Sequence, residues 1–174
     1  MDIWLLRHAA AHDRAPSGRD ADRELTPEGL DRARAVARGL ALLEPGIARV
    51  VTSPYRRARQ SAEAAARSLG VELTESRALE PERDPEEILR EVASEGGGDV
   101  LLVGHQPHLG ALLGLLAAGP GIEIPMKKAS VARIALEGRW SGTLKTLLPP
   151  KYLEALDNAK AKAPAEAKAK ACDA

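Results

Sequence analysis

The stretch Ile3-Trp4-Leu5-Leu6-Arg7-His8-Ala9 decides the expected fold. Its first four residues form an apolar run that is too short for a buried helix and has the length of a buried parallel strand. The run ends at Arg7 and His8, so an arginine and a histidine stand at the carboxyl end of the predicted strand. Open α/β sheets bind their ligands at that end of their strands. The dipeptide alone also fits a surface charge beside a loop histidine, so the rest of the chain must decide.

The rest of the chain alternates short apolar runs with helical patterns. Further strands are predicted at residues 49–52, 71–73 and 100–103. Helices are expected to begin at turn and cap signals, namely Thr26-Pro27, Ser53-Pro54, Asp84-Pro85 and Pro107. Residues 130–136 and 140–148 are typical of a β-hairpin added to the sheet edge. This order predicts an α/β fold, a three-layer αβα sandwich with a mainly parallel sheet.

Composition excludes several classes of protein. The 174 residues suffice for one domain with a real core. Lys and Arg number 25, as do Asp and Glu, so the net charge is zero and a nucleic-acid binder is not expected. Apolar runs are too short to span a membrane, and residues 1–4 have no signal-peptide character. The single cysteine, Cys172, permits no intrachain disulfide, so we expect a cytoplasmic protein.

The predicted domain covers residues 1–150, and residues 151–174 form an Ala/Lys-rich tail. Tyr152, Leu153 and Leu156 offer apolar side chains for docking over one or two helical turns. Pro164 is expected to interrupt that helix, and the last ten residues to be solvated.

Three predicted strand ends carry similar side chains. The first gives Arg7-His8, the second Ser53-Pro54-Tyr55-Arg56-Arg57, and a later one Gly104-His105. In a parallel sheet these ends lie along one edge, so two histidines and two or more arginines can converge. Arginine at a helix N-terminus is locally unfavourable, unless an anion is shared between its side chain and the helix amides. Phosphate fits this site, because the arginine fork matches its oxygens and a neutral imidazole is a competent nucleophile.

These motifs resemble those of the histidine phosphatase superfamily, which has the phosphoglycerate mutase-like fold. Leu6-Arg7-His8-Ala9 is similar to the family's Arg-His-Gly motif, with alanine for glycine. Residues 53–61, Ser-Pro-Tyr-Arg-Arg-Ala-Arg-Gln-Ser, resemble its Ser-Pro-x-x-Arg-Ala-x-Gln-Thr motif. Gly104-His105 matches the family's second histidine, and residues 25–29 resemble its Leu-Thr-x-x-Gly segment. The resemblance covers roughly residues 1–148.

The resemblance implies a phosphatase. We expect it to need no cofactor or metal, because the charge of the predicted site comes from arginines and no carboxylate cluster is there to bind a cation. His8 would be the nucleophile that becomes phosphorylated, and Arg7, Arg57 and His105 would bind the phosphoryl oxygens. Only residues 58–104 lie between Arg57 and His105, which leaves no room for a helical lid.

The short, lidless chain looks like the SixA-type branch, the phosphohistidine phosphatases. Residues 79–81, Leu-Glu-Pro, also resemble the Leu-x-Pro segment that follows the third strand in that branch. The expected partner is therefore a protein that carries phosphohistidine. Glu80, Glu82 and Asp84 are the candidates for a general acid, and the sequence does not choose among them.

Three alternatives stay open at this point. One is a phosphatase of the same superfamily that acts on small phosphate esters. Another is a non-catalytic module that binds phosphate or a phosphoprotein. The third is a metal centre, because all four histidines, His8, His12, His105 and His108, fall in the predicted site. The arginines argue against the metal centre, since they repel a cation.

Overall fold

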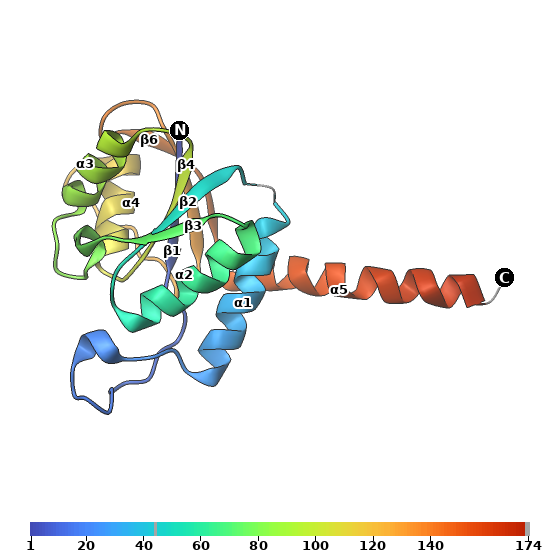
Figure 1. Cartoon of the computed structure of the whole chain (residues 1–174). Coiled ribbons are helices and arrows are strands. Elements are labelled where there is room, and N and C mark those ends of the chain that lie inside the picture. Colours follow the sequence, from blue (N-terminus) through green and yellow to red (C-terminus); the bar gives the residue numbers. More distant parts are fainter. Residues whose placement is uncertain (44, 173–174) are drawn as a thin grey trace.

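The computed structural model describes residues 1–43 and 45–172, and the side chains of the last helix as far as residue 163. Its centre is one sheet with the strand order β3-β2-β4-β1-β5-β6 (Figure 1). The strands are β1 (Asp2–Arg7), β2 (Ile47–Thr52), β3 (Glu72–Glu75), β4 (Asp99–Gly104), β5 (Val131–Leu136) and β6 (Gly142–Leu148). The first four are parallel, while β5 runs antiparallel to β1 and β6 antiparallel to β5. The predicted mainly parallel sheet with an added hairpin is confirmed.

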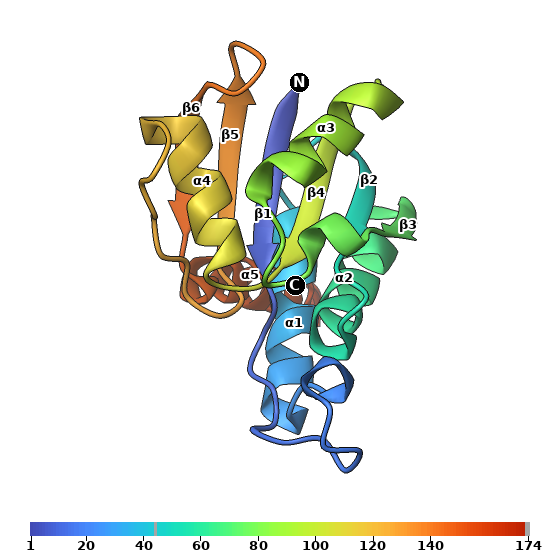
Figure 2. The same cartoon turned by 90° about the vertical axis from the view of Figure 1, so that its left-hand side faces the viewer.

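Five α-helices and two short 3₁₀ helices surround this sheet in the described residues. They are α1 (Pro27–Ala41), α2 (Arg56–Leu69), α3 (Pro85–Glu95), α4 (His108–Ala118), α5 (Pro150–Cys172), η1 (Asp20–Asp22) and η2 (Arg77–Leu79). Figure 2 shows α3 and α4 on the face of the sheet opposite to α1 and α2. The three-layer αβα sandwich is therefore the observed architecture.

The central strands are apolar throughout because helices cover both of their faces. In β1, Ile3 and Leu5 pack into the core beneath α3 and α4, whereas Trp4 and Leu6 pack into the core beneath α1 and α2. All four side chains are buried. This two-sided burial explains why the strand appears in the sequence as an unbroken apolar run.

Helix α1 begins as its sequence predicts. The Thr26 hydroxyl oxygen accepts a hydrogen bond from the Gly29 amide at 3.0 Å, and Pro27 occupies the first helical position. A Cβ at Gly29 would lie 2.0 Å from the carbonyl oxygen of Ala10. Glycine is therefore required where the chain leaving β1 crosses the first turn of α1.

The start of α2 differs from the prediction. The helix begins at Arg56 after Tyr55, so Pro54 is not its first residue. Ser53 does not cap the helix; its hydroxyl oxygen accepts from the Tyr55 amide and also contacts His105. The expected cap-and-proline start was wrong because the hydroxyl is used by the site.

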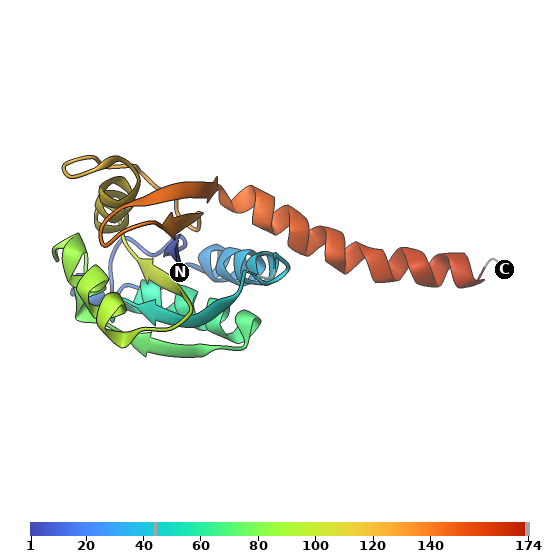
Figure 3. The same cartoon turned by 90° about the horizontal axis from the view of Figure 1, so that it is seen from above.

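The tail forms one long helix, α5, which projects from the body of the protein (Figure 3). Of the three apolar side chains expected to dock, Leu153 is fully buried, whereas Tyr152 and Leu156 are exposed. The backbone remains helical through Pro164, so the predicted interruption is wrong. The flanking Ala and Lys residues are strong helix formers that tolerate the one lost hydrogen bond. The expected solvation of the last ten residues and the state of Cys172 lie outside the described side chains.

Among the described residues, no helix combines the length and the apolar character needed to cross a bilayer.

Candidate active site

The carboxyl ends of β1, β4 and β2 meet, because these strands are neighbours in the sheet. The backbone amide of His8 donates to the carbonyl of Gly104 at 3.0 Å. The amide of Ser53 donates to the carbonyl of Val103 at 3.0 Å. These two hydrogen bonds join the segments that follow the three strands, as the sequence predicted.

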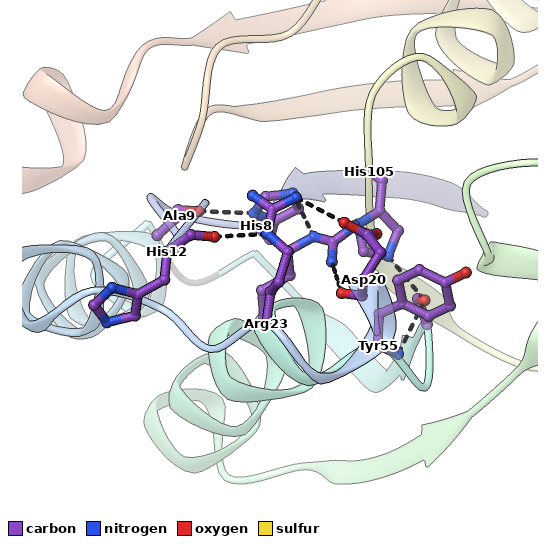
Figure 4. A network of polar contacts seen from close by, with 9 residues as sticks. His8, Ala9, His12, Asp20, Arg23, Tyr55 and His105 are labelled. Carbon is purple, nitrogen blue, oxygen red and sulfur yellow. Dashed lines mark hydrogen bonds and ion pairs between the residues drawn. The ribbon is translucent and has the colours of Figure 1, made fainter. Parts of the chain in front are cut away.

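The imidazole of His8 is held at both of its nitrogens (Figure 4). Nδ1 lies 2.7 Å from the carbonyl oxygen of Ala9, which can only accept, so the ring proton is assigned to Nδ1. Nε2 lies 3.3 Å from Nε of Arg57, an N–H donor. The unprotonated nitrogen of His8 therefore faces a guanidinium group, where an anion would be stabilised.

The residue after His8 is fixed by α2. The Ala9 amide donates to the Ser61 hydroxyl oxygen at 3.2 Å, and that hydroxyl donates to the Arg57 carbonyl at 3.0 Å. Ala9 is fully buried and is not among the residues with a positive φ. Alanine therefore fits where the motif that the sequence resembles has glycine.

His105 lies beside His8, with ring centroids 5.1 Å apart. Its Nε2 lies 2.9 Å from the hydroxyl oxygen of Ser53, which already accepts from the Tyr55 amide. This arrangement favours donation from the hydroxyl to Nε2, which leaves the proton of His105 on Nδ1. That Nδ1 is buried and has no hydrogen-bond partner within the described chain. An unpaired buried donor beside His8 is suited to a phosphoryl oxygen.

Arg57 reaches the site from the first turn of α2. Its guanidinium is almost fully buried, and while Nε faces His8, both Nη atoms bind Asp20. Its neighbour Arg56 turns instead to Glu24, at 3.0 Å. The structure thus places Arg57, and not Arg56, beside Nε2 of His8.

Arg7 extends from the last position of β1. Its Nη1 donates to the carbonyl of Met126 at 2.6 Å, and its Nε is buried without a partner in the described chain. Burial lowers the pKa of Arg7, and its charge in turn contributes to lowering the pKa of His8. Arg7 therefore adds positive charge to the surroundings of His8.

Both imidazoles are neutral at pH 7. Burial is the main reason that the pKa of His8 falls to about 4. The hydrogen bond to the Ala9 carbonyl raises this pKa, whereas the charges of Arg57 and Arg7 lower it. Burial lowers the pKa of His105 further, to about 2, with His8 and Arg57 as additional causes. A neutral His8 keeps its lone pair, which a nucleophile requires.

Known proteins share this arrangement of motifs. The model of the histidine phosphatase superfamily (branch 1) matches residues 3–85. The phosphohistidine phosphatase SixA of Escherichia coli (strain K12) is 32% identical over 158 residues, which cover 86% of this chain and 94% of that protein. The chain belongs to the histidine phosphatase superfamily. Its expected class of enzyme, a phosphatase, is thereby confirmed.

Solved structures of superfamily members agree. The structure of the protein histidine phosphatase SixA complexed with tungstate superposes with a TM-score of 0.78 at 29% identity, covering 88% of this chain and 99% of that one. The phosphoglycerate mutase from Bacillus anthracis str. Sterne has a TM-score of 0.67 at 17% identity, covering 91% of this chain and 96% of that one. The second match shows the shared fold alone, and it confirms the phosphoglycerate mutase-like architecture.

None of the three acid candidates from the sequence is hydrogen-bonded to His8, Arg57 or His105 within the described residues. Asp84 caps α3, with its carboxylate accepting from the Glu86 amide at 2.9 Å. Burial raises the pKa of Tyr55, and the charges of Glu80 and Glu82 raise it further. The charges of Glu80 and Glu82 therefore act on Tyr55, whose ring lies 5.1 Å from that of His105.

The sequence placed all four histidines in the predicted site, but the described structure does not bring His12 to the other three. His12 lies on an exposed loop and its ring points away from His8, so only its carbonyl joins the polar network (Figure 4). His108 is buried at the start of α4, near the charge of Asp84. In the part of the chain that the structure describes, no three His, Cys, Asp or Glu side chains are grouped to hold a metal ion.

Asp20 is the site residue that sequence reasoning missed. It lies in the loop between β1 and α1, where it starts η1, and it contacts Arg57 through both its carbonyl and its carboxylate. No local sequence signal separates it from Asp13 or Asp22 in the same loop. Its place depends on how the whole loop folds back over α2.

Proposed function

We propose that this phosphatase removes the phosphoryl group from phosphohistidine on a partner protein, through a phosphoryl intermediate on His8. The observation that carries the proposal is the setting of the His8 ring. Nδ1 is tied to the Ala9 carbonyl at 2.7 Å, and the lone pair of Nε2 faces the Arg57 N–H at 3.3 Å.

In the first step, Nε2 of His8 attacks phosphorus while the P–N bond to the substrate imidazole breaks. The electron pair of that bond leaves with the substrate imidazole, which takes up a proton. In the second step, water attacks phosphohistidine-8, the new P–N bond breaks, and inorganic phosphate leaves with His8 restored. Nε of Arg57, Arg7 and Nδ1 of His105 are proposed to bind the phosphoryl oxygens as charge shifts onto them.

The choice of phosphohistidine over an ester is supported by how little proton donation its leaving group needs. An imidazole leaving group demands less of a general acid than an alkoxide does. Asp20 is the carboxylate that contacts Arg57, and because it is ionised at neutral pH it has no proton to donate to an alkoxide. Burial alone would raise the pKa of Asp20, but hydrogen bonds from Arg23 and Arg57 hold that pKa below its ordinary value.

The connection between Arg57 and His105 supports a substrate carried on a protein. Residues 58–104 are used for the rest of α2, β3, η2, α3 and β4. Small substrates would therefore gain little binding energy beyond their phosphoryl group. A protein substrate can add contacts along the loop at residues 11–24 and the segment at residues 81–85. The relative named phosphohistidine phosphatase points to the same class of substrate.

The test compares kcat/KM for a protein carrying phosphohistidine with kcat/KM for 3-phosphoglycerate and a sugar phosphate. We expect the protein substrate to be favoured at least about tenfold, roughly 1.4 kcal/mol. A small ester preferred by that margin would contradict the phosphohistidine proposal and favour the small-ester alternative. No turnover of any of these substrates would favour the non-catalytic binding module. Full activity is expected in EDTA, and activity restored only by Zn²⁺ or Mg²⁺ would favour a metal centre.

A further inference from the structure

The Arg57 guanidinium has two edges for hydrogen bonding, and Asp20 binds one of them. Arg57 Nη1 donates to the Asp20 carbonyl at 2.7 Å, and Nη2 donates to Asp20 Oδ2 at 2.8 Å. These two donors form the end of the planar group. The side edge, made of Nε–H and the remaining Nη2–H, is turned towards Nε2 of His8, which lies 3.3 Å from Nε.

We infer that Asp20 is a positioning residue, which holds the end of the Arg57 guanidinium so that the side edge is presented to the phosphoryl group. The inference rests on the proposed function of Arg57 as a phosphoryl ligand. A carboxylate on the end edge does not compete with an anion on the side edge, because an arginine has five N–H donors in a fixed plane. The contact with Asp20 prevents the guanidinium from rotating at the end of the long Arg57 side chain.

Asp20 is itself fixed from the other side. Its Oδ1 accepts from Nη1 of Arg23 at 2.7 Å, and Nε of Arg23 donates to the carbonyl of His12 at 2.6 Å. The base of the loop is closed by a hydrogen bond from the His12 amide to the Glu24 carbonyl at 2.9 Å. Figure 4 shows the contacts from the loop backbone through Arg23 to Asp20, and Arg57 continues the chain from Asp20 to His8. The carboxylate, although half exposed, is thus held at both oxygens, by Arg23 on one side and by Arg57 on the other.

The same loop supplies a matched control. Asp22 binds the Ser17 hydroxyl at 2.6 Å and Nε of Arg19 at 2.7 Å. It therefore shares the loop, the charge and the helix η1 with Asp20, but within the described residues its carboxylate is hydrogen-bonded to Ser17 and Arg19 and not to Arg57. Asp22→Ala tests whether any effect comes from a general disturbance of the loop.

The experiment measures three quantities for the wild type, Asp20→Asn, Asp20→Ala and Asp22→Ala. They are kcat/KM with the phosphohistidine protein, the affinity for tungstate by calorimetry, and the NMR signal of the Arg57 Nε–H. We expect Asp20→Ala to lose about tenfold to a hundredfold in kcat/KM, mainly in kcat, and to bind tungstate more weakly. Asp20→Asn keeps a neutral acceptor and should fall between Asp20→Ala and the wild type. The Arg57 signal should broaden in the same order, while Asp22→Ala should match the wild type in all three.

Several results would overturn the inference. Tighter tungstate binding by Asp20→Ala would mean that the carboxylate competes with the anion. Unchanged affinity and an unchanged Arg57 signal would reduce Asp20 to a structural loop residue. A loss of kcat confined to an alkyl phosphate ester, with phosphohistidine unaffected, would make Asp20 a proton donor. Tungstate binding and the Arg57 signal need no turnover, so they test the inference even if the phosphohistidine proposal fails.

Discussion

At the scale of single residues, the hydrogen bonds of the two imidazoles decide which ring nitrogen carries the proton. His8 has its proton on Nδ1 because the Ala9 carbonyl accepts it, and burial beside two arginines keeps the ring neutral. Nε2 of His105 contacts Ser53, and its Nδ1 is buried with no partner in the described chain. One ring offers a lone pair and the other offers a donor, which is the pairing that phosphoryl transfer requires.

The first prediction concerns the titration of His8. Its pKa is about 4 in the folded protein, against the ordinary value of 6.5. The unfolded chain therefore binds a proton between pH 6.5 and 4 that the folded protein does not bind. The stability associated with this group is complete above pH 6.5 and is lost as the pH falls through 4. NMR of the ring nitrogens should show a neutral Nδ1–H tautomer that protonates near pH 4.

A sample unfolded in urea supplies the reference for this titration, since its histidines have no folded environment. A His8 midpoint near 6.5 in the folded protein would contradict the assigned burial and charge effects.

The second prediction concerns Ser53. Removing its hydroxyl in Ser53→Ala leaves both nitrogens of His105 unpaired, so the tautomer is no longer set. We expect kcat/KM to fall about tenfold and the free energy of unfolding to fall by about 1–3 kcal/mol. Ser53→Thr keeps the hydroxyl and should recover most of the activity. Equal activity in the wild type and Ser53→Ala would show that His105 is oriented by other contacts.

At the scale of elements, the described side chains of α5 attach it to the domain through its first turns. Leu153 is fully buried against the face of the sheet that α1 covers, and a Cβ at Gly39 would lie 2.1 Å from the Leu153 carbonyl oxygen. Asp157 binds Arg38 through two hydrogen bonds of 2.7 and 2.8 Å. We propose that residues 1–150 carry the chemistry, and that α5 contributes stability through these first turns.

The third prediction follows from this attachment. A chain that stops after residue 163 should match the full chain in stability and turnover. A chain that stops after residue 150 should keep its turnover but lose about 2–5 kcal/mol of unfolding free energy, the range for removing a buried leucine side chain. Urea unfolding measures the difference, with Leu153→Ala expected to be destabilised and the exposed Tyr152→Ala expected to be neutral. Lost turnover in a folded chain that stops after residue 150 would place the tail in the site.

The elements differed in how far the sequence could predict them. Strands β1 and β4 were predictable because burial on both faces leaves an unbroken apolar run, and Arg7, His8, Arg57 and His105 follow strands or open a helix. Asp20 was not predictable, because its contact with Arg57 spans a loop without periodic signals. The start of α2 was misplaced for a related reason, since a tertiary contact to His105 takes the Ser53 hydroxyl away from capping.

At the scale of the whole molecule, the sheet order explains how one small domain can bring all the site residues together. The order β2-β4-β1 brings three distant segments of sequence to one edge, and the hairpin of β5 and β6 extends the sheet beyond β1. The net charge of the chain is zero, yet the site gathers Arg7 and Arg57 around neutral imidazoles. The fold thus concentrates positive charge where we propose that a phosphoryl group binds.

The central claim is that His8 carries the phosphoryl group during turnover, and a rapid-quench experiment tests it most directly. The protein is mixed with a partner protein carrying a radioactive phosphohistidine and quenched in alkali within the first turnover. We predict a phosphoryl label on the enzyme that is stable to base, labile to acid and located on the peptide containing His8. His12→Ala should keep this label, because its ring points away from the site. His8→Ala should show neither label nor turnover, and normal turnover by His8→Ala, or a label on another residue, would contradict the account.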